Sequence, residues 1–201
     1  MNKLPPHLEN PIDNIILQCT EQLLPCLHAT GHTPNIITTY SVTSGVLAVW
    51  ALHQGHIATF LFAMTASYVF DCLDGQLARA YGMTSHVGDV YDHATDTVVF
   101  LAVLVVMVKR YRHLPAFGAV AACVGLLLLL SGCHIGNQEA YYRPPGGGDD
   151  SKTLSVISCL AGILPIEGSR WFGSGTFWLS LLVCIVILER QLRRIVKVAK
   201  S

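Results

Sequence analysis

The sequence predicts an all-α, polytopic membrane protein with six transmembrane helices and an amphipathic surface helix near its N-terminus. Three observations support this fold class. The 201 residues are 52% hydrophobic and 13% charged, and the mean hydropathy is +0.48, which exceeds what one globular core needs. Six apolar segments follow one another along the chain. Before them, apolar residues alternate with polar ones at approximately helical period.

The first predicted element is the amphipathic helix, from Pro11 to about His28. Its apolar positions are Ile12, Ile15, Ile16, Leu17, Leu23, Leu24 and Leu27, and the polar residues between them are Asp13, Asn14, Gln18, Glu21 and Gln22. This pattern is typical of a helix that lies on a membrane surface. A helix packed on a soluble domain is the alternative, but the remaining chain is too apolar to supply such a domain. We therefore expect an N-terminal segment, residues 1–35, and a six-helix transmembrane domain, residues 36–201.

The six apolar segments lie near residues 36–53, 56–71, 94–109, 115–134, 153–166 and 173–190. A bilayer core about 30 Å thick requires about 20 residues per helix. The second, third and fifth segments are shorter, so they can span only if neighbouring polar residues continue the helix. We expect the second helix to run past Arg79 and the third to begin near Gly88.

Four aspartates occur where these two helices meet. Asp71 and Asp74 are three residues apart, and Asp92 and Asp96 are four apart, so each pair projects from one face of its helix. Such carboxylates can converge on a hard cation, and ionisable residues at membrane depth are functional candidates. Capping and ion pairing are the alternative, but only Arg79 is a close basic neighbour in sequence. The spacing therefore predicts a metal pocket.

Small residues beside the first pair predict room for a substrate. Gly75 and Ala78 would let a flat, bulky ligand approach the helix backbone. The complete arrangement, DxxDGxxAR, eight residues, then GxxxDxxxD, resembles the signature of the CDP-alcohol phosphotransferase (CDP-alcohol phosphatidyltransferase) family, and every fixed position is filled. The resemblance centres on residues 32–100.

The resemblance implies a membrane-embedded transferase of phospholipid biosynthesis. Such an enzyme moves a substituted phosphate from a CDP-activated donor to an alcohol and releases CMP. It implies two divalent ions, Mg²⁺ or Mn²⁺, held by Asp71, Asp74 and Asp92, with Asp96 as the general base and a further metal ligand. The residues implied to bind substrate are Gly75, Ala78 and Gly88, which make space for the CDP moiety, and Arg79, which pairs with phosphate oxygens.

Three interpretations of the function remain open, two that differ in the donor and one from another functional class. A compact six-helix chain favours CDP-diacylglycerol as the lipid donor and a small alcohol as the acceptor. His93, directly after Asp92, is similar to CDP-choline and CDP-ethanolamine:diacylglycerol phosphotransferases. Thr97 stands where phosphatidylglycerophosphate and phosphatidylinositol synthases typically carry Lys or Arg. A cation channel or transporter would explain the aspartates but not Gly75 and the other small residues of the motif.

The charge pattern bears on partners and orientation. The formal net charge is zero, so nothing suggests nucleic acid as a partner; we expect the lipid bilayer and a second copy of the chain, as a homodimer. Six spans would place nine of the 13 Lys and Arg residues on the side of the N-terminus: Lys3, Arg79, Arg143, Lys152, Arg190, Arg193, Arg194, Lys197 and Lys200. The positive-inside rule then predicts that both termini and the active site face the cytoplasm.

Overall fold

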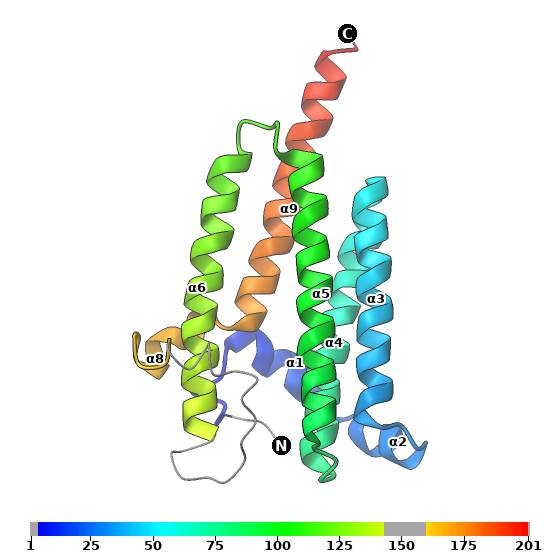
Figure 1. The fold of residues 1–201 in the computed structure, drawn as a ribbon, viewed down its shortest axis with the longest axis vertical. Coiled ribbons are helices and arrows are strands. Elements are labelled where there is room, and N and C mark those ends of the chain that lie inside the picture. Colours follow the sequence, from blue (N-terminus) through cyan, green and yellow to red (C-terminus); the bar gives the residue numbers. More distant parts are fainter. Residues whose placement is uncertain (1–3, 143–159, 201) are drawn as a thin grey trace.

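The computed structural model describes residues 4–142 and 160–200. These residues form helices and no strand, which confirms the predicted fold class. The elements, shown in Figure 1, are α1 (Pro11–Glu21), α2 (Leu24–Ala29), α3 (Pro34–Gln54), α4 (Ile57–Ala80), α5 (His86–Tyr111), α6 (Phe117–Tyr142), α8 (Ile166–Ser169), the 3₁₀ helix η2 (Arg170–Phe172) and α9 (Ser174–Val198). α4 continues past Arg79, and α5 begins just before Gly88, so both expected helix extensions are confirmed.

Local sequence signals set several helix ends. Pro34 occupies the first turn of α3, where its missing N–H costs no hydrogen bond. The same helix ends at Gly55, whose φ of 80° is left-handed and favours glycine. Ser85 caps α5, because its Oγ accepts a hydrogen bond from the Gly88 N–H at 3.1 Å. These ends fix where the motif-bearing segments of α4 and α5 begin and stop.

The long helices pack side by side around one apolar core. α3 makes its largest interfaces with α4 and α5, and α9 packs against α5 and α6. Gly45 brings α3 close to α5, since a Cβ at this position would lie 2.7 Å from Val99 Cγ1. The fully buried core side chains include Leu52, Phe60, Val103, Tyr111, Leu181, Ile185 and Leu188. The polar pocket described below lies at one end of this core.

Five helical stretches of the described residues are long and apolar enough to span a membrane: α3, α4, α5, α6 and the stretch from α8 to α9. Asn137, near the end of α6, donates a hydrogen bond to the Leu164 carbonyl at 2.8 Å. α6 and α8 therefore meet at the same end of the bundle (Figure 1). The expected segment 153–166 falls largely outside the described residues, and the sixth span stays a prediction.

This arrangement places α1 at one end of the bundle and the C-terminal end of α9 at the other (Figure 1). The basic residues of α9 therefore lie at the same end as those that close α5. The residues gathered there are Lys109, Arg110, Arg112, Arg190, Arg193, Arg194 and Lys197. The count of basic residues on each side was made for six spans and does not apply to the five described spans. These five spans therefore do not support the predicted cytoplasmic orientation of the active site.

The N-terminal segment forms two short helices where the sequence predicted one. α1 ends at Glu21 and α2 starts at Leu24. α1 packs against α4 and α9 and buries Asp13, Leu17 and Thr20. It lies across the end of the bundle that holds the aspartates (Figure 1). Its contact with the membrane surface stays a prediction.

Candidate functional site

α4 and α5 bring three of the four aspartates together. Carboxylate oxygens of Asp71, Asp74 and Asp92 all lie within 4.8 Å of one another. The first two come from the C-terminal part of α4 and the third from the N-terminal part of α5. The spacing of three residues places the α4 pair on one face. The convergence between helices therefore has the geometry that the sequence predicted.

Asp96 lies one turn further along α5 from Asp92. It lines the same pocket, and its side chain contacts that of Asp71. It does not belong to the group of three carboxylates within 4.8 Å. Asp96 therefore lies at the edge of the cluster, in contact with Asp71 but outside the group of three.

Side chains from α3 and α1 hold the motif in place. The Thr38 hydroxyl of α3 donates to Asp74 Oδ2 at 2.5 Å, which orients this carboxylate. Gln76, fully buried, donates from Nε2 to the Leu17 carbonyl at 3.0 Å and accepts from the Thr20 hydroxyl at 2.5 Å. Asp71 and Asp74 therefore sit on a segment of α4 that is fixed on both sides.

The aspartates line a pocket of about 320 Å³, a size within the range of small-molecule sites. One wall, which we call the aspartate wall, consists of Asp71, Asp74, Gly75, Arg79, Asp92, His93 and Asp96. The other, which we call the N-terminal wall, consists of Glu9, Asp13, Leu17, Ile135, Gln138 and Ser174. Tyr68, Cys72 and Thr97 complete the lining. The pocket is thus lined by five helices, α1, α4, α5, α6 and α9, and by the segment before α1.

The substrate residues expected from the sequence have different positions. Gly75 and Arg79 line the pocket, whereas Ala78 and Gly88 are not among its lining residues. A Cβ at Gly88 would lie 2.9 Å from Ser85 Oγ and 3.1 Å from Asn35 Oδ1. Gly88 therefore lies against the cap of α5 and the start of α3, and the substrate roles of Ala78 and Gly88 stay predictions.

The carboxylate group suits a hard divalent cation. Its ligand atoms are all oxygens, the kind that Mg²⁺ and Mn²⁺ prefer. Asp92 Oδ1 is buried and has no hydrogen-bond partner among the described residues. A buried carboxylate oxygen without a donor is costly, and a bound cation removes that cost. The residues present therefore fit the divalent ions implied by the motif.

Sequence reasoning missed the N-terminal wall. Asp13 is buried, accepts a hydrogen bond from the Tyr68 hydroxyl at 2.5 Å, and accepts another from the Gly175 N–H at 3.2 Å. Burial raises the pKa of Asp13 to about 6, and the hydrogen bonds from Tyr68 and Gly175 offset part of this rise. In the sequence Asp13 is one polar position of an amphipathic helix, and no local pattern distinguishes it from its neighbours.

Comparison with known proteins identifies the family to which this site belongs. The model of the CDP-alcohol phosphatidyltransferase family matches residues 31–188. The chain belongs to the CDP-alcohol phosphatidyltransferase family. It is accordingly a transferase of substituted phosphate groups in phospholipid biosynthesis and an integral membrane protein, and this family uses divalent metal ions. Membership in a transferase family excludes the channel or transporter that the aspartates alone left open.

A curated relative supports the same membership. The chain is 36% identical over 189 residues to a phosphatidylinositol phosphate synthase of Mycobacteroides abscessus, and the match covers 88% of this chain and 83% of that protein. No solved structure matches the chain. For a CDP-alcohol phosphatidyltransferase, a CDP-linked lipid donor and an alcohol acceptor are implied as substrates. The family match starts after Glu9, Asp13 and Leu17, so three residues of the N-terminal wall lie outside it.

Proposed function

We propose that this CDP-alcohol phosphatidyltransferase transfers a phosphatidyl group from CDP-diacylglycerol to a small alcohol and releases CMP. The observation that carries the proposal is the group of three carboxylates within 4.8 Å, in a pocket that also contains Gly75 and Arg79. A phosphatidyl donor is supported by the name of the relative, a phosphatidylinositol phosphate synthase. His93 after Asp92 remains the one feature that favours a CDP-linked amino alcohol as donor.

In the proposed site Asp71, Asp74 and Asp92 would hold two divalent ions, Mg²⁺ or Mn²⁺, and Asp96 would be a further ligand. Bound there, the ions would neutralise the donor pyrophosphate and the departing CMP. Arg79 lines the pocket next to Gly75 and pairs with phosphate oxygens of the donor. This arrangement holds the donor phosphorus beside the carboxylate that serves as base.

Asp96 is the proposed general base. It accepts the proton of the acceptor hydroxyl while the alcohol oxygen bonds to the lipid-bearing phosphorus and the bond to CMP breaks. A hydroxyl is a poor nucleophile at neutral pH, so a nearby acceptor for its proton is required. Asp96 suits this role because it lines the pocket next to Asp71 and does not belong to the group of three carboxylates.

The experiment that tests the function measures CMP release by the purified full chain in detergent micelles. We expect release from CDP-diacylglycerol in the presence of Mg²⁺ or Mn²⁺ and a small alcohol. The same assay with CDP-choline or CDP-ethanolamine and diacylglycerol tests the alternative. CMP release with CDP-choline or CDP-ethanolamine, and none with CDP-diacylglycerol, would contradict the proposed phosphatidyl transfer and support the alternative.

We propose that Gly75 makes space for the CDP moiety. The atoms nearest to a Cβ at Gly75 would be those of the flexible end of Arg79, with Nη1 at 3.0 Å. We expect Gly75→Leu to abolish donor binding while the protein stays folded, because the larger side chain occupies the pocket and displaces Arg79. Equilibrium binding of a CDP-linked lipid checks this result.

The control for this variant is Gly118→Leu, since a Cβ at Gly118 has open space around it. This second substitution adds the same side chain to α6 and is expected to leave donor binding unchanged. Normal CDP binding by Gly75→Leu would show that the donor lies elsewhere in the pocket. Size-exclusion chromatography in detergent verifies that both variants remain folded.

We propose that the pocket faces the cytoplasm, where nucleotide-linked donors are made from soluble CTP. The basic residues at the opposite end argue for the reverse orientation under the positive-inside rule, so a direct measurement is needed. Thr84, between α4 and α5, and His113, between α5 and α6, are exposed and lie at opposite ends of the bundle. In a cysteine-free background, we expect an impermeant maleimide to label His113→Cys on intact cells and Thr84→Cys only after permeabilisation.

The same labelling experiment decides the number of spans. Lys200→Cys will react together with His113→Cys if the five described spans are complete, and together with Thr84→Cys if a sixth exists. Labelling of Thr84→Cys on intact cells would overturn the cytoplasmic orientation.

Homodimer formation also stays a prediction.

A further inference from the structure

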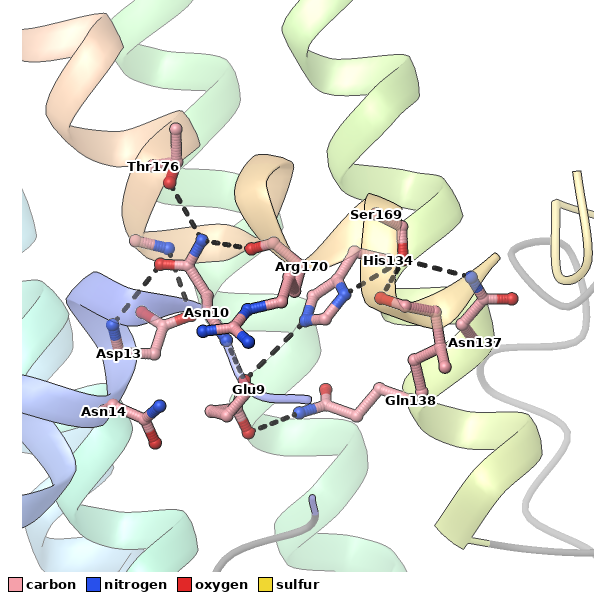
Figure 2. Close-up of polar contacts among 12 residues, drawn as sticks. Glu9, Asn10, Asp13, Asn14, His134, Asn137, Gln138, Ser169, Arg170 and Thr176 are labelled. Atoms are coloured by element: carbon pink, nitrogen blue, oxygen red, sulfur yellow. Dashed lines mark hydrogen bonds and ion pairs between the residues drawn. The ribbon is translucent and has the colours of Figure 1, made fainter. Parts of the chain in front are cut away.

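The N-terminal wall of the pocket is built from residues that the sequence motif does not include. Glu9 is 3% exposed; its Oε1 accepts a hydrogen bond from the Asn10 N–H at 3.0 Å, and its Oε2 accepts one from Gln138 at 3.2 Å. His134 Nε2 lies 3.7 Å from Oε1 (Figure 2). The Glu9 carboxylate is therefore held at the pocket edge between the N-terminal segment and α6.

Asn10 joins the N-terminal wall to η2 and α9 through hydrogen bonds. Its side-chain amide donates to the Arg170 carbonyl at 2.6 Å and to the Thr176 hydroxyl at 2.8 Å, while its Oδ1 caps α1 through the Ile12 N–H at 3.0 Å (Figure 2). Arg170 also donates a hydrogen bond to the His7 carbonyl. The segment before α1 is thus tied to η2 and α9 by hydrogen bonds that span most of the sequence.

Two glycines permit this close approach. A Cβ at Gly173 would lie 2.7 Å from Asn10 Cβ, and one at Gly175 would overlap Asp13 Oδ1. The start of α9 therefore lies directly against Asn10 and Asp13. This packing holds the two carboxylates of the N-terminal wall in fixed positions, and neither is a solvated surface group.

The charges of the two walls differ in a way that bears on the acceptor. The basic side chains among the described lining residues are Arg79 and His93, and both belong to the aspartate wall. The N-terminal wall presents the carboxylates of Glu9 and Asp13. The hydrogen-bond partners of the Asp13 side chain, the Tyr68 hydroxyl and the Gly175 N–H, are both uncharged. Asp13 is therefore a buried carboxyl group whose direct partners provide no positive charge.

We propose that Glu9 and Asp13 recognise the acceptor, and that this wall selects a small alcohol carrying an ammonium group over an alcohol carrying a phosphate. The inference rests on the phosphatidyl transfer proposed above. In a partly buried pocket, a phosphate would be repelled chiefly by Asp13, because Glu9 has the His134 imidazole 3.7 Å from its Oε1 and Asp13 has uncharged direct partners. An ammonium group would supply the positive charge that the direct partners of Asp13 lack, and would donate hydrogen bonds to it.

The test compares acceptors in the CMP-release assay with the full chain and CDP-diacylglycerol. The probes are the amino alcohols ethanolamine and 3-aminopropanol, uncharged glycerol and inositol, and the phosphorylated alcohols glycerol 3-phosphate and inositol 1-phosphate. We expect the amino alcohols to have the highest kcat/KM. Asp13→Asn should raise the KM for amino alcohols by about tenfold or more, because it removes a charged hydrogen-bond acceptor, while the KM for glycerol and for the donor changes by less than about twofold.

Matched controls separate recognition from folding. Glu21→Gln removes a carboxylate from the exposed end of the same helix, outside the pocket, and should change none of these values. Glu9→Gln keeps the size of the side chain and should shift acceptor preference in the same direction as Asp13→Asn. An equal loss with every acceptor in both variants would show that the two residues only support the fold, and would overturn the inference.

The outcomes also distinguish the inference from the function on which it rests. Efficient CMP release with phosphorylated alcohols, or a preference for uncharged polyols that Asp13→Asn leaves intact, overturns the acceptor assignment and leaves phosphatidyl transfer standing. Failure to release CMP from CDP-diacylglycerol with any acceptor overturns the proposed function, and the acceptor assignment with it.

Discussion

Asp74→Asn is expected to abolish both divalent-ion binding and CMP release. Asp74 is 4% exposed, belongs to the three-carboxylate group, and is oriented by the Thr38 hydroxyl at 2.5 Å. The substitution removes one negative charge and one anionic ligand from a site whose ligands are all oxygen. Metal ions stabilise phosphoryl-transfer charge by several kcal/mol, so a loss on the order of 1,000-fold in kcat/KM follows.

Mn²⁺ binding to the detergent-solubilised protein, followed by electron paramagnetic resonance, measures the first effect independently of turnover. Asp71→Asn should give the same two losses. Asp89→Asn is the matched control, because Asp89 lies on α5 close to Asp92 but belongs neither to the carboxylate group nor to the pocket lining. Undiminished turnover in excess EDTA, or normal Mn²⁺ binding by Asp74→Asn, would contradict the metal assignment.

The aspartate wall could be predicted because its geometry is local. Spacings of three and four residues place side chains on one helical face, and the short connection between Ala80 and His86 keeps the end of α4 close to the start of α5. Apolar segment lengths, together with the motif, also located the extended ends of both helices. The small size of Gly75 pointed to the pocket. Gly88 instead donates its N–H to the N-cap residue Ser85, a contact that the motif does not reveal.

The N-terminal wall could not be predicted because it depends on tertiary contacts. Asn10 and Thr176 are far apart in sequence and meet through one hydrogen bond, and hydrophobic periodicity carries no information about such a pair. Asp13 reads as a solvated residue of an amphipathic helix until Gly175 is seen to lie against it. Thr38 likewise lies within an apolar segment of α3, and only packing shows its contact with Asp74.

The number of spans marks another limit of sequence reasoning. Segment 153–166 is apolar but short, and length alone cannot distinguish a tilted span from a surface segment. The described helices instead join α6 to α8 at one end of the bundle through Asn137 and Leu164. A count of charges depends on this connection, because one span more or less moves every basic residue of α9 to the other side.

Asp96→Asn is expected to retain donor and metal binding while kcat falls about 100-fold to 10,000-fold, the usual loss when a general base is removed. The expectation follows from position: Asp96 lines the pocket and contacts Asp71, but it stands outside the three carboxylates that lie within 4.8 Å. Single-turnover CMP release at saturating donor measures the chemical step, and Mn²⁺ binding measures the metal site separately.

His93 is the competing base and provides the control. Its Nδ1 lies 2.7 Å from the Asp89 carbonyl, so this nitrogen is engaged with the backbone of α5 and not with the acceptor. We therefore expect His93→Gln to lower kcat by less than about tenfold, well below the loss from removing a general base. Loss of Mn²⁺ binding in Asp96→Asn would assign Asp96 to coordination alone, and a larger kcat loss in His93→Gln would assign the proton transfer to the imidazole.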